Sequence, residues 1–257
     1  MQEYLDRIGF TGTPAVDLET LAALQRAHLS TVPFENLAVY RGEAVSTSTT
    51  WSLPKIIQRG QGGWCFELNG AFAVLLESLG FTVLRLGAAV LLDGPNRLVD
   101  HLALEVQLDE PYLVDVGFGD SFIAPLRLND REPQQDEAGW FQLIDSAEGL
   151  TLTKLDVQVD ADTAGPVGDG GAGVPIPQYR FRRVAHEMAD FDDASDRLRT
   201  DRTLHWSAKP FATRLVDGGP RRVTLLKDRL KYHGDGQVTE TAVAEDEWVS
   251  VLERLFR

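Results

Sequence analysis

The hydrophobic pattern of this chain changes at residue 80 from the period of a helix to the period of strands. Before that point, "CFELNGAFAVLLESLG" (65–80) places Leu68, Phe72 and Leu75 on one helical face and ends at a glycine, which commonly follows a helix. After it, "HLALEVQL" (101–108) alternates strictly between apolar and less apolar residues, as a half-buried strand does. Helices followed by a run of strands predict an α+β fold.

The same patterns divide the chain into three regions, 1–80, 81–177 and 178–257. The first is predicted to be helical, with Asp17 capping a helix that ends before Pro33. The second holds strand-like segments and closes with "DADTAGPVGDGGAGVPIP" (160–177), which lacks periodicity and is predicted to be a flexible loop or interdomain segment. The third mixes a helix, strand-like pieces and a closing amphipathic helix, "EDEWVSVLERLFR".

Charge and cysteine content exclude several classes of function. The chain has 25 basic and 39 acidic residues, a net charge of −14, so it offers no basic field for nucleic acid. Its single cysteine excludes an internal disulfide and a multi-cysteine zinc site, and no metal is expected. No apolar run reaches the roughly 18 residues of a membrane span, and the first residues do not resemble a signal peptide. We therefore expect a cytoplasmic protein that contacts no membrane.

That single cysteine, Cys65, stands at the predicted start of a helix, behind Gly62 and Gly63. A helix N-terminus and a neighbouring imidazolium both favour the nucleophilic thiolate. The two glycines allow backbone N–H groups to approach a reacting carbonyl, as an oxyanion hole requires. The alternative interpretation is a small buried apolar residue, which is common for a free cysteine. The choice depends on whether a base and a carboxylate accompany it.

Among the five histidines, His101 is the best candidate base, because it opens an alternating strand on the less apolar face. The others lie in helical or irregular, more polar surroundings and are predicted to be surface or structural residues: His28, His186, His205 and His233. Asp115 in "YLVDVGFG" (112–119) is costly to bury without a partner, and His101 on a neighbouring strand is the natural one. Alternatively, Asp115 caps the turn that follows it.

The simplest strand register does not join these two residues. If residues 109–111 form a plain hairpin loop, Asp115 lies opposite Glu105, and His101 is about 13 Å away along the same face. A bulge, a longer loop or a twist is then required to bring them together.

Four ordered motifs resemble the arylamine N-acetyltransferases of the bacterial type: "VPFENL" (32–37), "GGWCFELNG" (62–70), "DHLALEV" (100–106) and "YLVDVGFG" (112–119). The resemblance extends from about residue 4 to residue 125 and is weaker beyond. It implies a helical bundle (1–80) that carries the cysteine, an antiparallel β-barrel (81–177) that carries the histidine and aspartate, and an α/β lid (178–257). The core of this fold is shared with cysteine proteases and transglutaminases.

The resemblance implies a ping-pong reaction and a role in xenobiotic metabolism. Cys65 would take an acetyl group from acetyl-CoA and pass it to an arylamine, an N-hydroxyarylamine or a hydrazine, with His101 as base and Asp115 as its orienting partner. Further roles are implied for Phe34 and Phe118 in the acceptor pocket, for Gly119 and Ser207 beside the CoA channel, and for Glu35 and Arg7 as structural supports.

The sequence departs from the family pattern at three places. Gln61 stands where an arginine is usual, the lid motif is reduced to "HWSAKPF" (205–211), and the C-terminal part is shorter than in many members, which could open the cleft to a larger amine. Two alternatives use the same three residues. One is an amide synthase of an ansamycin-type macrolactam pathway, with an acyl carrier protein as partner. The other is a transglutaminase- or protease-like cysteine hydrolase.

Overall fold

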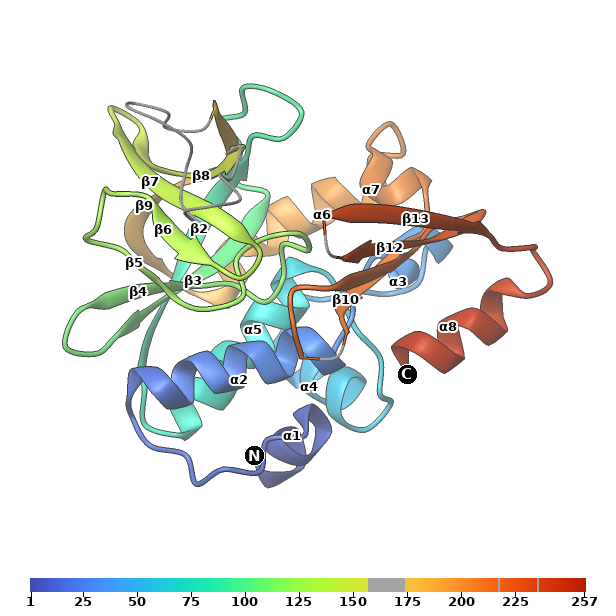
Figure 1. The fold of residues 1–257 in the computed structure, drawn as a ribbon, viewed down its shortest axis with the longest axis horizontal. Coiled ribbons are helices and arrows are strands. Elements are labelled where there is room, and N and C mark those ends of the chain that lie inside the picture. The colour runs from blue at the N-terminus through green and yellow to red at the C-terminus, as the bar shows by residue number, and fades with distance from the viewer. Residues whose placement is uncertain (157–173, 217, 235) are drawn as a thin grey trace.

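The computed structural model describes residues 1–156, 174–216, 218–234 and 236–257. Within them, a group of N-terminal helices lies against an eight-stranded antiparallel sheet and a separate five-stranded sheet (Figure 1). This arrangement confirms the α+β fold predicted from the change of hydrophobic period. No helix in the described residues is long and apolar enough to cross a membrane.

The N-terminal region forms five helices, and the last of them is buried and carries the cysteine. They are α1 (Gln2–Ile8), α2 (Leu18–Thr31), α3 (Leu37–Arg41), α4 (Thr49–Ile57) and α5 (Cys65–Ser78). The Asp17 side chain accepts the backbone N–H of Thr20 at 2.8 Å and caps α2, as predicted. Helix α5 is apolar on almost every side and lies at the centre of the molecule (Figure 1), because its neighbours cover all of its faces.

The eight-stranded sheet curls into a nearly closed barrel. Its strands are β2 (Thr82–Val90), β3 (His101–Gln107), β4 (Pro111–Val114), β5 (Leu126–Arg127), β6 (Gln134–Asp136), β7 (Gly139–Ser146), β8 (Gly149–Asp156) and β9 (Val174–His186), in the order β5-β4-β3-β2-β9-β8-β7-β6. The Gln134 side chain joins the two edge strands, since it bonds the backbone N–H of Arg127 at 2.8 Å and its C=O at 3.0 Å. Apolar side chains such as Phe141 and Leu143 fill the interior.

Strand β9 corrects the prediction for residues 174–177, which pair with β8 instead of forming a loop. The remainder of the predicted loop, 160–173, lies outside the described residues. Pro175 and Pro177 suggested irregular backbone, but a proline is accepted where a strand has a partner on one side only. Strand β9 pairs with β2 only from Tyr179 onward, so at Pro175 and Pro177 it has β8 as its single neighbour. The predicted boundary after residue 177 consequently falls inside β9.

The five-stranded sheet combines distant parts of the chain. Its strands are β1 (Phe34–Glu35), β10 (Ala212–Leu215), β11 (Arg222–Leu225), β12 (Arg229–Gly234) and β13 (Gln237–Ala242), in the order β1-β10-β11-β12-β13. The accompanying helices are η1 (Met188–Phe191), α6 (Asp192–Thr200), α7 (His205–Ala208) and α8 (Trp248–Phe256). Strand β1 comes from the N-terminal region, so the C-terminal sheet is attached directly to the segment that precedes the cysteine helix.

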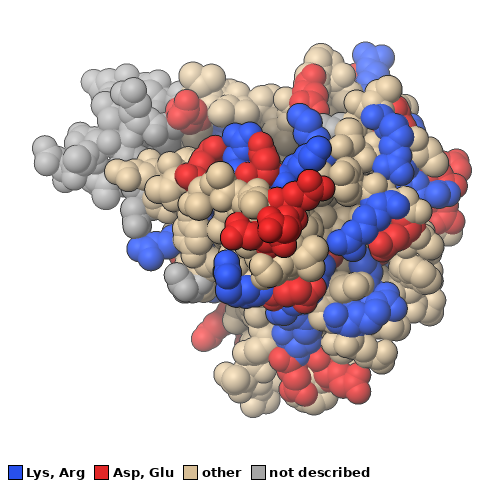
Figure 2. Space-filling model, turned by 90° about the vertical axis from the view of Figure 1, so that its right-hand side faces the viewer, with Lys and Arg blue, Asp and Glu red and all other residues tan. Residues whose placement is uncertain are grey.

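Basic and acidic side chains are intermixed on the side of the molecule that carries this sheet (Figure 2). Glu240 of β13 forms ion pairs with two cations of β12, at 3.2 Å from Arg229 and 2.7 Å from Lys231. These two positive charges are therefore locally compensated.

Candidate active site

Three elements bring Cys65, His101 and Asp115 together. Cys65 is the first residue of α5, His101 is the first residue of β3, and Asp115 follows the last residue of β4. The Nε2 atom of His101 lies 2.7 Å from Oδ2 of Asp115, and both side chains are buried. Cys65 is only 6% exposed and lines a small cavity that it shares with His101. The structure thus places all three predicted residues at one site.

The pairing of β3 with β4 explains how the histidine and the aspartate meet. The register predicted from a 109–111 loop is wrong by two residues, because Leu113, not Asp115, lies opposite Glu105. The loop is 108–110 instead, since Pro111 belongs to the strand, where it pairs with Gln107. A shift of two residues keeps every side chain on its face but brings Asp115 closer to His101. Strand β4 then ends at Val114, which frees Asp115 to reach across.

Asn69, which sequence reasoning did not select, holds Asp115 in place. Its Nδ2 donates to Asp115 Oδ1 at 2.9 Å and to the Leu102 carbonyl at 2.6 Å, and its Oδ1 accepts the Val116 N–H at 2.9 Å. It follows Cys65 by four positions, which places both residues on one face of α5. A polar amide at that spacing in a largely apolar helix was the available signal.

The other contacts around the carboxylate and the imidazole leave little freedom. The Gly117 N–H donates to Asp115 Oδ1 at 2.8 Å. The rings of Tyr179 and Phe118 pack against His101 at centroid distances of 4.9 and 5.2 Å. Tyr179 reaches the site from β9, far along the chain, and no pattern in the neighbouring sequence indicated that it belongs to the site. Burial, together with the negative charge of Asp115, raises the pKa of Tyr179 well above its usual value, so its hydroxyl stays neutral.

The electrostatics of the site favour a charged imidazole. Burial disfavours the imidazolium of His101, but the charge and hydrogen bond of Asp115 and the interaction with Cys65 outweigh it and raise the pKa of His101 to about 10. Because Nε2 donates to Asp115, Nδ1 is the nitrogen available to exchange a proton with Cys65. An imidazolium beside a cysteine is the arrangement in which a cysteine nucleophile is activated.

Of the four predicted pocket residues, two line the cavity beside Cys65. Phe34 and Phe118 form part of its wall. Gly119 lies behind Phe34, and a Cβ there would come within 3.2 Å of that ring. Ser207 is buried and does not line this cavity, because its hydroxyl donates to the Leu204 carbonyl at 3.1 Å.

Trp206 was not selected from the sequence, yet it lines the same cavity. Its ring packs on Phe34 at a centroid distance of 5.5 Å. A neighbouring cavity of about 300 Å³ shares Val90, Asp100, Leu198 and Trp206 with the small one and extends along the 93–98 loop and α6. The space next to Cys65 therefore has room beyond it for a small organic molecule.

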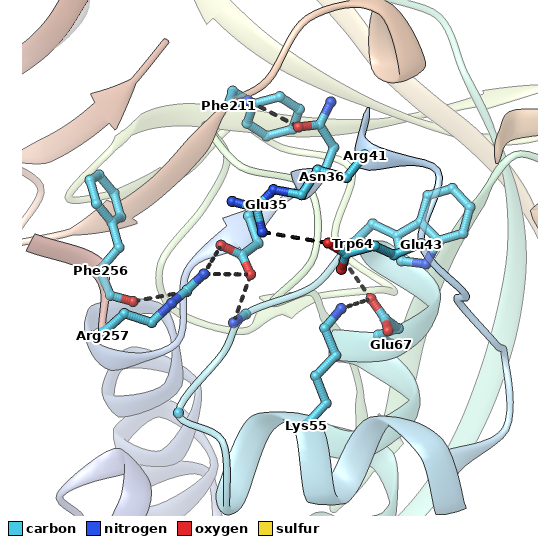
Figure 3. Close-up of polar contacts among 12 residues, drawn as sticks. Glu35, Asn36, Arg41, Glu43, Lys55, Trp64, Glu67, Phe211, Phe256 and Arg257 are labelled. Atoms are coloured by element: carbon cyan, nitrogen blue, oxygen red, sulfur yellow. Dashed lines mark hydrogen bonds and ion pairs between the residues drawn. The ribbon is translucent and has the colours of Figure 1, made fainter. Parts of the chain in front are cut away.

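Polar contacts fix the segment that leads into Cys65 from behind (Figure 3). The Arg7 guanidinium bonds the carbonyls of Ile56 and Gly60 at 3.2 and 3.1 Å, and Glu35 accepts the Gly62 N–H at 3.1 Å. A Cβ on Gly62 would lie 1.9 Å from the Pro33 carbonyl oxygen, so only glycine fits there. Arg7 and Glu35, which the family resemblance implied as structural supports, thus both contact this segment.

Known proteins resemble this chain over most of its length. A profile described as N-acetyltransferase matches residues 17–257. The chain is 36% identical over 162 residues to the pineal gland arylamine N-acetyltransferase isozyme NAT-3 of Gallus gallus, which covers 60% of this chain and 56% of that relative's length. It is 35% identical over 250 residues to the arylamine N-acetyltransferase of Escherichia coli K12, covering 93% of this chain and 81% of that one. The solved structure of Mycobacterium marinum arylamine N-acetyltransferase in complex with CoA matches with a TM-score of 0.84 and 29% identity, covering 98% and 89% of the two chains.

Proposed function

Because the chain belongs to the arylamine N-acetyltransferase family, we propose that it transfers an acetyl group from acetyl-CoA to an aromatic amine or hydrazine through Cys65. The observation that carries this proposal is the buried His101–Asp115 pair, joined at 2.7 Å, beside the cysteine at the start of α5. A cysteine next to an imidazole that a carboxylate orients is the arrangement of a covalent catalyst.

In the first half-reaction the Cys65 thiolate attacks the thioester carbonyl of acetyl-CoA. A bond forms between Sγ and the acetyl carbon, the bond from that carbon to the CoA sulfur breaks, and the departing CoA thiolate takes a proton from the His101 imidazolium. We expect the first-turn N–H groups of α5, which a helix leaves without intrahelical acceptors, to stabilise the developing oxyanion. The products are CoA and an acetyl-cysteine.

In the second half-reaction the acceptor nitrogen attacks the acetyl-cysteine. The neutral His101 accepts the proton that the nitrogen loses, and the Cys65 thiolate leaves, which regenerates the thiolate–imidazolium pair. Asp115 keeps the ring oriented throughout, because one of its oxygens holds Nε2 while Asn69 and Gly117 hold the other. Each group thereby returns to its initial state.

The donor and the acceptor rest on different support. The CoA complex of the Mycobacterium marinum protein, which shares the fold over 98% of this chain, supports acetyl-CoA as donor. Phe34, Phe118 and Trp206 around Cys65, together with the adjoining 300 Å³ cavity, support a small aromatic acceptor, because aromatic rings pack well on one another.

The test is to mix the protein with acetyl-CoA in the absence of any amine and to measure intact mass with a peptide map. We expect one acetyl group on Cys65, with release of CoA and no modification of the Cys65→Ala variant. Addition of an arylamine or hydrazine should then discharge the acetyl group. A protein that stays unmodified contradicts the acetyl-CoA proposal and directs attention to a carrier-bound acyl donor. Rapid loss of the acetyl group to water alone would favour a hydrolase.

A further inference from the structure

A buried carboxylate stands behind the glycine segment that leads to Cys65. The Glu35 side chain, 4% exposed, accepts the Gly62 N–H at 3.1 Å on Oε1. The Arg257 guanidinium, 16% exposed, donates to the same carboxylate through Nη2, at 3.0 Å from Oε2 and 3.3 Å from Oε1 (Figure 3). One carboxylate thus connects the residue after α8 with the segment before α5.

Strand β1 and the glycine segment are joined by backbone hydrogen bonds and by one side chain, that of Glu35. Its own backbone N–H donates to the Gly63 carbonyl at 2.8 Å, and the Gly63 N–H donates to the Pro33 carbonyl at 3.3 Å. These bonds and the isolated bridge between Phe34 and Gly63 align β1 with the glycine segment. The Gly62 N–H, the remaining donor of the pair, has the Glu35 carboxylate as its acceptor.

A carboxylate at this depth needs a cation to stay in place, because an unpaired charge is costly to bury. Among the described residues, the ion pair to Glu35 comes from Arg257, 222 positions away in the sequence. Gln61, adjacent to Gly62, carries no charge. The positive partner of Glu35 is therefore supplied by the residue that follows α8.

We propose that Arg257 is a positioning residue for Cys65: its guanidinium holds the Glu35 carboxylate in place, and Glu35 in turn holds Gly62 and the start of α5. Helix α8 itself is anchored on the five-stranded sheet, because Val251, Leu252 and Phe256 pack against that sheet. The reactivity of the cysteine consequently depends on the docking of the C-terminal helix. This inference rests on the proposed role of Cys65 as the nucleophile.

The test compares Arg257→Met, Glu35→Gln and the double variant by the rate at which iodoacetamide alkylates Cys65 across a range of pH. Arg257→Met should lower that rate about tenfold, because small displacements of a reacting group cost large factors in rate. The double variant should recover most of the loss, since a neutral glutamine still accepts the Gly62 N–H without needing a cation. Arg254→Met, which removes an exposed cation of α8, is the matched control and should react as wild type does.

Two outcomes overturn the proposal. An unchanged alkylation profile in folded Arg257→Met would leave Arg257 with a purely structural role. A double variant no faster than Arg257→Met would show that the effect does not pass through Glu35. Arg257→Gln, which keeps a donor but loses the charge, is measured alongside in case Arg257→Met does not fold, and an unchanged rate there also overturns the proposal. Alkylation needs no acetyl donor, so failure of acetyl transfer and failure of this inference are distinguishable.

Discussion

Buried ion pairs lie on both sides of the start of α5, and their cations differ in kind. In front of it, Asp115 pairs with His101, whose imidazole can release and regain a proton. Behind it, Glu67 pairs with Lys55 at 2.7 Å and Glu35 pairs with Arg257 at 3.0 Å (Figure 3). Ammonium and guanidinium groups keep their charge at neutral pH. The front is therefore suited to proton transfer and the back to fixed positioning.

The carboxylates of Asp115 and Glu67 also differ in how fully they are bonded. Both oxygens of Asp115 have donors, from His101 on one side and from Asn69 and Gly117 on the other. Glu67 has one oxygen bonded to Lys55 and the other buried without a hydrogen bond among the described residues. Burial raises the pKa of Glu67 against the opposing effect of Lys55. Bonding is thus more complete for Asp115, where the chemistry is proposed to occur, than for Glu67.

The strongest test of this contrast is Asp115→Asn. We expect the rate of Cys65 acetylation to fall about a hundred- to ten-thousand-fold, because the imidazole loses the partner that fixes its tautomer and stabilises its charge. Stopped-flow release of CoA measures the rate. Full activity in this variant would reduce Asp115 to a residue that caps the end of a strand.

Asn69→Ala should have the next largest effect. It leaves Asp115 Oδ1 with the Gly117 N–H alone and removes the partners of the Leu102 carbonyl and the Val116 N–H. We expect acetylation about tenfold slower and a lower free energy of unfolding, by about 1–3 kcal/mol for each buried group left unpaired. Urea denaturation and the acetylation assay check the two effects. Acetylation at the wild-type rate would show that Gly117 alone holds the carboxylate.

Lys55→Met should separate stability from activity. The variant leaves the Glu67 carboxylate buried without its cation, so we expect the free energy of unfolding to fall by about 3–5 kcal/mol. The acetylation rate of the folded protein should change much less than in Asp115→Asn. The companion Lys55→Met/Glu67→Gln variant should regain stability. A loss of activity as large as that of Asp115→Asn would remove the distinction between front and back.

A further test is the dependence of stability on pH that comes from the His101 side chain. The pKa of His101 rises from 6.5 to about 10 on folding, so its contribution to stability is fully present below about 6.5 and is lost as pH rises toward 10. The difference in free energy of unfolding between wild type and His101→Gln should shrink across that window. A difference that stays constant would mean that His101 is neutral in the folded protein.

Local patterns in the sequence predicted much of this site. The helix that begins at Cys65 and the strand that begins at His101 are visible from periodicity, and the Asp17 cap of α2 from one residue and its neighbours. The pairing of His101 with Asp115 followed from the cost of burying a lone carboxylate, although the predicted strand register contradicted it. These inferences concern residues whose surroundings are set by nearby sequence.

Other features depend on which distant segments pack together. The two-residue shift between β3 and β4 was decided by the loop at 108–110. Tyr179 and Trp206 reach the site from elements far along the chain, and Arg257 likewise reaches Glu35 behind it. The sequence by itself determined the helix that begins at Cys65, the strand that begins at His101 and the chemical groups that they carry, because hydrogen bonding and hydrophobic period act over a few residues. Only the tertiary structure decided which of those groups meet, because strand register and sheet order are set by the burial of whole faces against one another.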